Sequence, residues 1–117
     1  MAYRVNLASD LRRRAVIRQK VRAEKRDALG QYPVEERTVD CVWCSVVPQT
    51  GSLLTGRAAE TALSRTTHKI IVRYRPDLRP DMWLIVDGVA YDILYILDPY
   101  LSHDHLEIFC EVRADDR

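Results

Sequence analysis

The sequence lacks the features that mark membrane-spanning, secreted or strongly charged proteins. No apolar run approaches the roughly eighteen residues of a membrane span, although 47% of the chain is hydrophobic. Residues 1–4 lack the apolar block of a signal peptide. The 18 Lys+Arg and 17 Asp+Glu residues give a formal net charge of +1, so no overall field attracts nucleic acid or an anionic membrane. We therefore expect a soluble protein made in the cytoplasm, with no membrane partner.

Cysteine is scarce, and its pattern argues against both a disulfide framework and a metal site. The chain has three cysteines, an odd number, and we expect reduced thiols. Cys41-Val-Trp-Cys44 resembles half of a zinc site, and His68, His103 and His105 are the other possible ligands. Residues three apart in a strand point to opposite faces, so one ion cannot bind both thiols. We interpret the thiols as small apolar groups and expect no metal and no cofactor.

A recognisable catalytic motif is also missing. His103-Asp104-His105 places two imidazoles beside a carboxylate, but a solvated loop between strands is the favoured interpretation. No serine lies in a Gly-x-Ser-x-Gly turn. Gly51 and Gly56 are not followed by the Lys-Ser or Lys-Thr of a phosphate-binding loop. We expect no enzyme activity and no small-molecule substrate.

What the second half of the chain does contain is a series of short β-strand patterns. Asp87-Gly88 between apolar runs is the strongest short-range hairpin signal, because a type I′ turn needs positive φ at both central positions. We predict strands over residues 67–74, 82–86, 89–97 and 106–112, with a loop over 100–105. In the last strand the inward residues are expected to be Leu106, Ile108, Cys110 and Val112.

The first half of the chain predicts two more strands. Residues 11–23 alternate, with apolar side chains on one parity and mostly basic side chains on the other, which favours a half-buried strand over a helix. Residues 24–37 carry both charge signs without a consistent face and are predicted to form a long exposed loop. Residues 38–48 are apolar on both parities, so we expect a central strand. Residues 49–65 form a small-residue excursion, a long loop with at most one or two helical turns.

Together these elements indicate a mainly β protein. About six strands with little helix fit a small antiparallel β-barrel with one long excursion between the second and third strands. We expect one domain over residues 1–117, with its core over 11–112 and flexible ends.

A basic segment near the N-terminus suggests one alternative function. Residues 12–26 hold eight of the 18 Lys+Arg residues, and a basic strand on a small barrel is how oligonucleotide-binding folds follow a phosphate backbone. Such sites also need exposed aromatic side chains, and this segment has none. A nucleic-acid-binding barrel is therefore the second hypothesis, and a subunit contact is the other interpretation of the same face.

The ordered set of strands resembles the head-tail joining family of tailed bacteriophages, also called head-closure or stopper proteins. Residues 11–17 resemble the opening strand of that family, and 42–46 its Trp-containing second strand. Residues 67–75 resemble the Thr-His-basic-aliphatic strand before its proline turn. Residues 80–82 and 87–93 resemble its hairpin, and 106–111 its closing strand. The resemblance covers about residues 11–112 in the right order and spacing.

The resemblance implies a structural virion protein without catalytic residues, which closes the filled head and connects it to the tail. It implies a ring of copies, expected to be a dodecamer, between the portal-bound adaptor and the tail-completion protein in the virion neck, after assembly in the host cytoplasm. The excursion would line the channel and retain packaged DNA; its candidate residues are Thr50, Gly51, Leu53, Leu54, Gly56, Arg57, Glu60 and Leu63. The candidate subunit or partner contacts are Arg12, Arg14, Arg18, Lys20 and Arg22.

Overall fold

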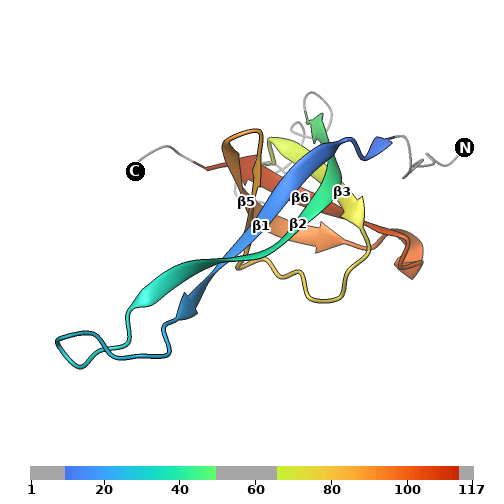
Figure 1. The fold of residues 1–117 in the computed structure, drawn as a ribbon. Coiled ribbons are helices and arrows are strands. Elements are labelled where there is room, and N and C mark those ends of the chain that lie inside the picture. Colours follow the sequence, from blue (N-terminus) through green and yellow to red (C-terminus); the bar gives the residue numbers. More distant parts are fainter. Residues whose placement is uncertain (1–9, 50–65, 114–117) are drawn as a thin grey trace, which may run out of the picture.

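A computed structural model describes residues 10–49 and 66–113. Within these ranges the strands are β1 Arg13–Arg22, β2 Val34–Pro48, β3 His68–Arg73, β4 Trp83–Val86, β5 Val89–Leu97 and β6 His105–Val112. A 3₁₀ turn, η2, covers Pro99–Leu101. The strands pair antiparallel and close a barrel in the order β1-β2-β3-β6-β5-β4 (Figure 1). The expected small antiparallel β-barrel is confirmed.

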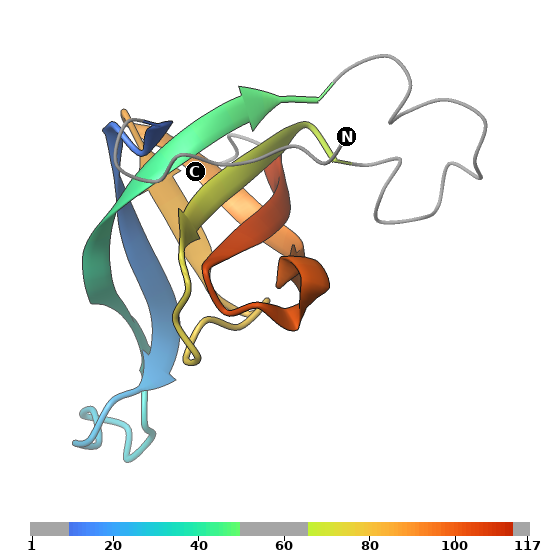
Figure 2. The same ribbon diagram turned by 90° about the vertical axis from the view of Figure 1, so that its right-hand side faces the viewer.

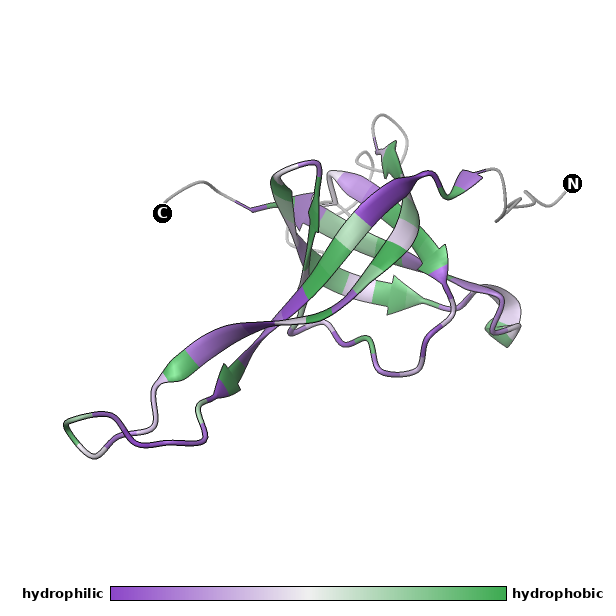
Figure 3. Cartoon of the chain, viewed as in Figure 1, coloured by the Kyte–Doolittle hydropathy of each residue, from purple (hydrophilic) through white to green (hydrophobic). Residues whose placement is uncertain are grey.

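The barrel core is apolar, as the alternation in the strands predicts. Each strand sends alternate side chains inward, and the connection between β3 and β4 adds two more. Figure 3 shows that hydrophobic residues, in green, are frequent along the barrel strands. The buried members are Ala15, Ile17, Cys44, Ile70, Val72, Leu78, Met82, Leu84, Val86, Tyr91, Ile93, Leu106, Ile108 and Cys110. The Asp87-Gly88 turn has φ of 52° and 80°, which confirms the predicted hairpin.

The last strand departs from the expected pattern at its end. Leu106, Ile108 and Cys110 are buried as predicted, but Val112 is 43% exposed. Val112 is the last residue of β6, where it pairs with Tyr91 of β5. Phe109 faces away from the core and is nevertheless 7% exposed, because its ring stacks on that of Tyr95 at a centroid distance of 4.7 Å.

The predicted loop over residues 24–37 is wrong at its C-terminal end. β2 begins at Val34, and residues 34–37 pair with β1 as far as Arg22. Here the two strands leave the barrel as a ribbon, which we call the arm and define as residues 19–37 (Figures 1 and 2). Both faces of the arm meet solvent, so its sequence lacks the apolar alternation that identifies a half-buried strand.

The expected central position of β2 is confirmed, but its two faces are not equally buried. β2 does lie between β1 and β3, and Cys44 is fully buried. Its outer face, however, exposes Trp43 by 51% and also Cys41. The register between β1 and β2 shifts at one point. Ile17 pairs with Asp40 and Arg18 with Thr38, so Val39 has no partner and forms a β-bulge.

Candidate assembly interface

The predicted contact residues lie along β1 and just before it. Arg14, Arg18, Lys20 and Arg22 alternate with the inward residues and share the outer side of the strand. Arg12 is exposed immediately before β1. Arg18 is half-buried, and the other members of the row are exposed.

Much of this row is engaged by side chains of β2 and of the loop at the end of the arm. The guanidinium of Arg14 lies 4.5 Å from the ring centroid of Trp43, and that of Arg22 lies 4.9 Å from that of Tyr32. Arg18 donates a hydrogen bond to Thr38 Oγ1 at 2.6 Å and forms an ion pair with Glu36 at 3.5 Å. The row is therefore a mixed surface of cations and aromatic rings, partly neutralised within the chain.

Sequence reasoning missed these aromatic partners. Trp43 and Tyr32 lie outside the basic segment, and they meet it only because β2 folds back antiparallel on β1. The available signal was the outward parity of Trp43 in β2, but identifying its partner required the strand register, which places it opposite Arg14.

The end of the arm is a tightly bonded turn. Asp27 Oδ1 accepts hydrogen bonds from the backbone N–H of Leu29 at 2.9 Å and of Gln31 at 3.0 Å. The N–H of Gly30, which has φ of 79°, donates to Asp27 O at 3.0 Å, and Asp27 N–H donates to Gln31 O at 2.7 Å. This turn holds Leu29 outward with 82% of its surface exposed.

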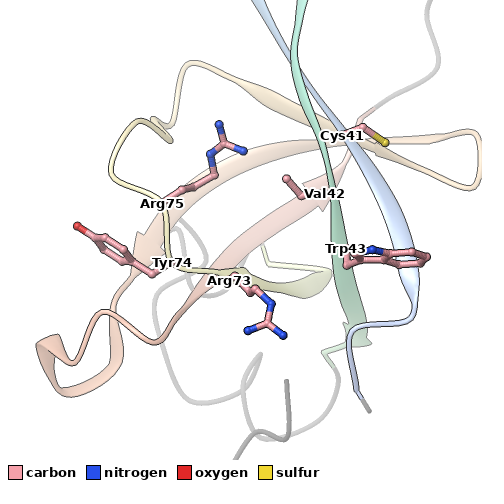
Figure 4. A pocket seen from close by; sticks show the side chains of 6 residues that line it. All are labelled: Cys41, Val42, Trp43, Arg73, Tyr74 and Arg75. Atoms are coloured by element: carbon pink, nitrogen blue, oxygen red, sulfur yellow. The ribbon is translucent and has the colours of Figure 1, made fainter. Parts of the chain in front are cut away.

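A cavity opens where β2 separates from β3. Pairing between the two strands extends only from Cys44 and Val72 to Pro48 and His68. Beyond Cys44 a cavity of about 290 Å³ lies between the strands. Figure 4 shows the side chain of Val42 pointing into this space. The lining residues are Cys41, Val42, Trp43, Arg73, Tyr74 and Arg75.

Ion pairs fix the open side of this cavity. Arg75 bonds Asp40 of β2 at 2.8 Å and Asp77 at 2.7 Å. The hydrogen bonds from Arg75 hold the pKa of both carboxyl groups below their usual range, so both remain charged at neutral pH. Arg75 thereby joins β2 to the chain after β3. The wall of the cavity is preformed.

The predicted channel residues lie outside the described ranges, but the base of their excursion does not. Gln49 N–H donates to Thr67 O at 2.9 Å, and Thr67 N–H donates to Cys110 O of β6 at 2.9 Å. Thr66 is fully buried. The chain thus leaves and re-enters the barrel at one hydrogen-bonded point. The residues concerned are Thr50, Gly51, Leu53, Leu54, Gly56, Arg57, Glu60 and Leu63.

The remaining candidate sites are separate structural groups. Cys41 is exposed and Cys44 is buried, which confirms that the two thiols face opposite sides. His103 Nδ1 bonds Asp98 at 2.5 Å in the loop, and His105 lies 3.8 Å from Glu107. In residues 10–49 and 66–113, no three His, Cys, Asp or Glu side chains gather as a metal site, and no helix could cross a membrane.

The comparison with known families identifies the chain. It matches the family of phage head completion proteins over residues 7–113. The chain belongs to this family. Membership confirms the family expected from the strand motifs and assigns a structural role in completing the phage head.

Solved structures share the fold of this head completion protein. The solution structure of protein SF1141 from Shigella flexneri 2a is 23% identical, with a TM-score of 0.72 over 96% of this chain and 100% of that chain. A chain in the virion of a native gene transfer agent particle is 22% identical, with a TM-score of 0.59 over 88% of this chain and 96% of that chain. No curated protein matches the head completion chain.

Proposed function

We propose that this head completion protein closes the filled head at the neck of the virion. Copies form a ring between the portal-bound adaptor and the tail-completion protein, after assembly in the host cytoplasm. Family membership supports the head-completion part of this proposal. A gene transfer agent is an equally good setting, since a chain of such a particle has the same fold.

Within that ring, residues 50–65 line the channel and retain the packaged DNA. The supporting observation is that the two ends of the excursion are bonded to each other, Gln49 to Thr67, and that Thr67 is bonded to β6. The excursion can therefore change its conformation without opening the barrel. The excursion is rich in Gly, Ala, Thr and Leu, and its only charges are Arg57, Glu60 and Arg65. Small side chains of this kind can pack against copies of themselves around an axis, and can rearrange when DNA passes.

Deleting residues 53–63 tests this function. The deletion spares Gln49 and Thr67, so the barrel should unfold at the temperature of the wild type, and particles should assemble and then lose DNA. Nuclease-resistant DNA per particle is the measurement. A matched variant, in which the same residues are replaced by Gly and Ser at equal length, separates the length of the excursion from its side chains. Full DNA retention by the deletion variant would contradict a channel role.

A nucleic-acid-binding barrel is the second candidate, and one observation favours it. Trp43 and Tyr32 supply aromatic rings beside the basic row, which sequence alone did not provide. Arginines already lie over these rings, however, and Glu36 neutralises Arg18, so the head-closure role is preferred. Titration of the protein with single-stranded DNA at several salt concentrations distinguishes the two candidate functions. Micromolar, salt-dependent affinity that is lost in Trp43→Ala supports the second candidate.

A further inference from the structure

The turn at the end of the arm has the properties of a binding anchor. Leu29 is 82% exposed, yet the backbone on both sides of it is fixed by Asp27. An apolar side chain on a preorganised turn binds with little loss of conformational entropy. Tyr32, which stacks with Arg22 and Arg26, and Val34, 67% exposed, widen the apolar surface behind it.

The arm itself has no covering element among the described residues. It projects beyond the barrel as two strands only (Figures 1 and 2). Isolated two-stranded ribbons are marginally stable in water. The arm is held by the cross-strand ion pair between Arg18 and Glu36, by the Arg37–Glu35 pair within β2 and by ring contacts, not by a core. An exposed ribbon of this kind with an apolar end is well suited to packing against another molecule.

The cavity between β2 and β3 offers a complementary receptor. A dry cavity of about 150 Å³ already admits a benzene-sized group, so 290 Å³ has room for a leucine side chain. Val42 supplies apolar surface, and the bond from Arg75 to Asp40 fixes β2 relative to the chain after β3 (Figure 4).

We propose that the arm of one copy inserts Leu29 into the β2–β3 cavity of the next copy in the ring. This inference rests on the proposed ring. The two surfaces are different parts of one chain, so the contact is head to tail, and in a closed ring every turn and every cavity is used.

Charge complementarity supports this occupant. Glu24, on the arm near the turn, and Arg73, on the rim of the cavity, are both exposed, and in the described part of the chain neither forms an ion pair with another residue. Insertion of the turn brings a carboxylate of one copy toward a guanidinium of the next. The pair would steer the arm into the cavity and disfavour the reverse orientation.

Cys41 provides a direct test, because its thiol is exposed and the residue lies next to Val42 in the lining of the cavity, within reach of a crosslinker. Particles are assembled from a mixture of wild-type and Leu29→Cys copies and treated with a short bismaleimide. We expect covalent dimers of the chain on denaturing gels, and their loss when Cys41→Ser is combined with Leu29→Cys. Tyr100→Cys, at a site 89% exposed on the η2 turn, is the matched control and should give none.

Three results would overturn the proposal: no dimers although the variant is present in particles, dimers that persist without Cys41, or crosslinks to a different protein. Exclusion of Leu29→Cys copies, but not Tyr100→Cys copies, from mixed particles would support it. Wild-type chains absent from particles would instead refute the proposed function, so the two failures are distinguishable.

A second variant tests the same contact without crosslinking. Leu29→Asp removes the apolar anchor at an exposed position, and the unfolding curve of the isolated chain should match that of the wild type. Incorporation into particles should be lost. The matched control Leu101→Asp, at a site 79% exposed, should retain it. Equal incorporation of the two variants would contradict the proposed contact.

Discussion

The ribbon of β1 and β2 has two halves that are paired alike and stabilised differently. In the barrel half, Ala15, Ile17 and Cys44 are fully buried, and β1 also pairs with β4. In the arm half no residue is buried, and Lys20 and Arg22 face Glu36 and Val34 across the ribbon. Strand pairing is continuous, so pairing alone does not distinguish the two halves.

We infer a different role for each half of the ribbon. Burial in the barrel half supplies the free energy that holds the fold, because apolar area removed from water is the main stabilising contribution. The arm half contributes little to that free energy. Its fixed turn, exposed leucine and cation–aromatic contacts form a surface that is available for contact with another molecule. Substitutions in the arm should therefore alter assembly far more than stability.

The largest effect is expected from truncation in the barrel half. Ile17→Ala leaves a cavity in a fully buried site and should lower the free energy of unfolding by roughly 2–5 kcal/mol. Val21→Ala, a matched aliphatic truncation on the same strand within the arm, should cost under about 1 kcal/mol. Urea unfolding followed by tryptophan fluorescence measures both. Equal losses would mean that the arm is as much a part of the core as the barrel.

Alkaline pH should weaken the barrel through its buried thiols. Burial raises the pKa of Cys44 from 9.0 to about 11 and that of Cys110 from 9.0 to about 12. Above pH 9 the unfolded chain ionises these thiols and the folded chain does not. Stability is therefore complete below pH 9 and falls between pH 9 and 11 by about 1.4 kcal/mol per pH unit for each thiol.

Denaturant titrations at several pH values check this expectation. In a Cys44→Ala, Cys110→Ala double variant, the decline attributable to thiols should disappear, even though the variant starts from a lower stability. A decline of the same slope in that variant would show that other groups cause it.

A smaller effect is expected on the outer face of the barrel half. Arg14 stacks on Trp43 on the outer wall, and both are exposed, so Arg14→Ala should cost about 0.5–1 kcal/mol. Arg14→Lys should recover part of the loss, since it keeps the charge but not the planar group. Thermal unfolding provides the measurement. No difference between Ala and Lys would mean that the stacked charge contributes nothing.

The smallest effect is expected from the ion pair at the base of the arm. A double-mutant cycle on Arg18 and Glu36 should give a coupling free energy of about 0.2–1 kcal/mol, because Glu36 is half exposed. The coupling should shrink in 1 M salt, where charges are screened within about 3 Å. A large, salt-independent coupling would mean that this pair stabilises the fold as core residues do, and that the arm and the barrel are not stabilised differently.

The barrel could be predicted from the sequence because burial of one face of a strand leaves an alternating pattern. The alternation in β1, the Asp87-Gly88 turn and the strand 89–97 reflect one face packed on a core, and the structure has all three. The arm could not be predicted, because a ribbon with solvent on both faces imposes no alternation.

The candidate interface was predictable only in part. The basic row was visible in the sequence, but its rings, the cavity beside Val42 and the turn at Asp27 depend on register and on where strands separate. Residues 49–65 were selected by composition and family resemblance, and their role in the channel stays a prediction.

The bulge at Val39 determines which charges can meet along the arm. If Val39 were paired with Arg18 and not bulged, Lys20 would stand opposite Arg37, and like charges directly across a ribbon repel. With the bulge, Lys20 stands opposite Glu36. Polar ribbons are prone to slip by one residue, since no buried face penalises the shift. A slip that pairs Val39 with Arg18 and removes the bulge would therefore exchange attraction for repulsion at Lys20, so the charges along the arm favour the bulged register.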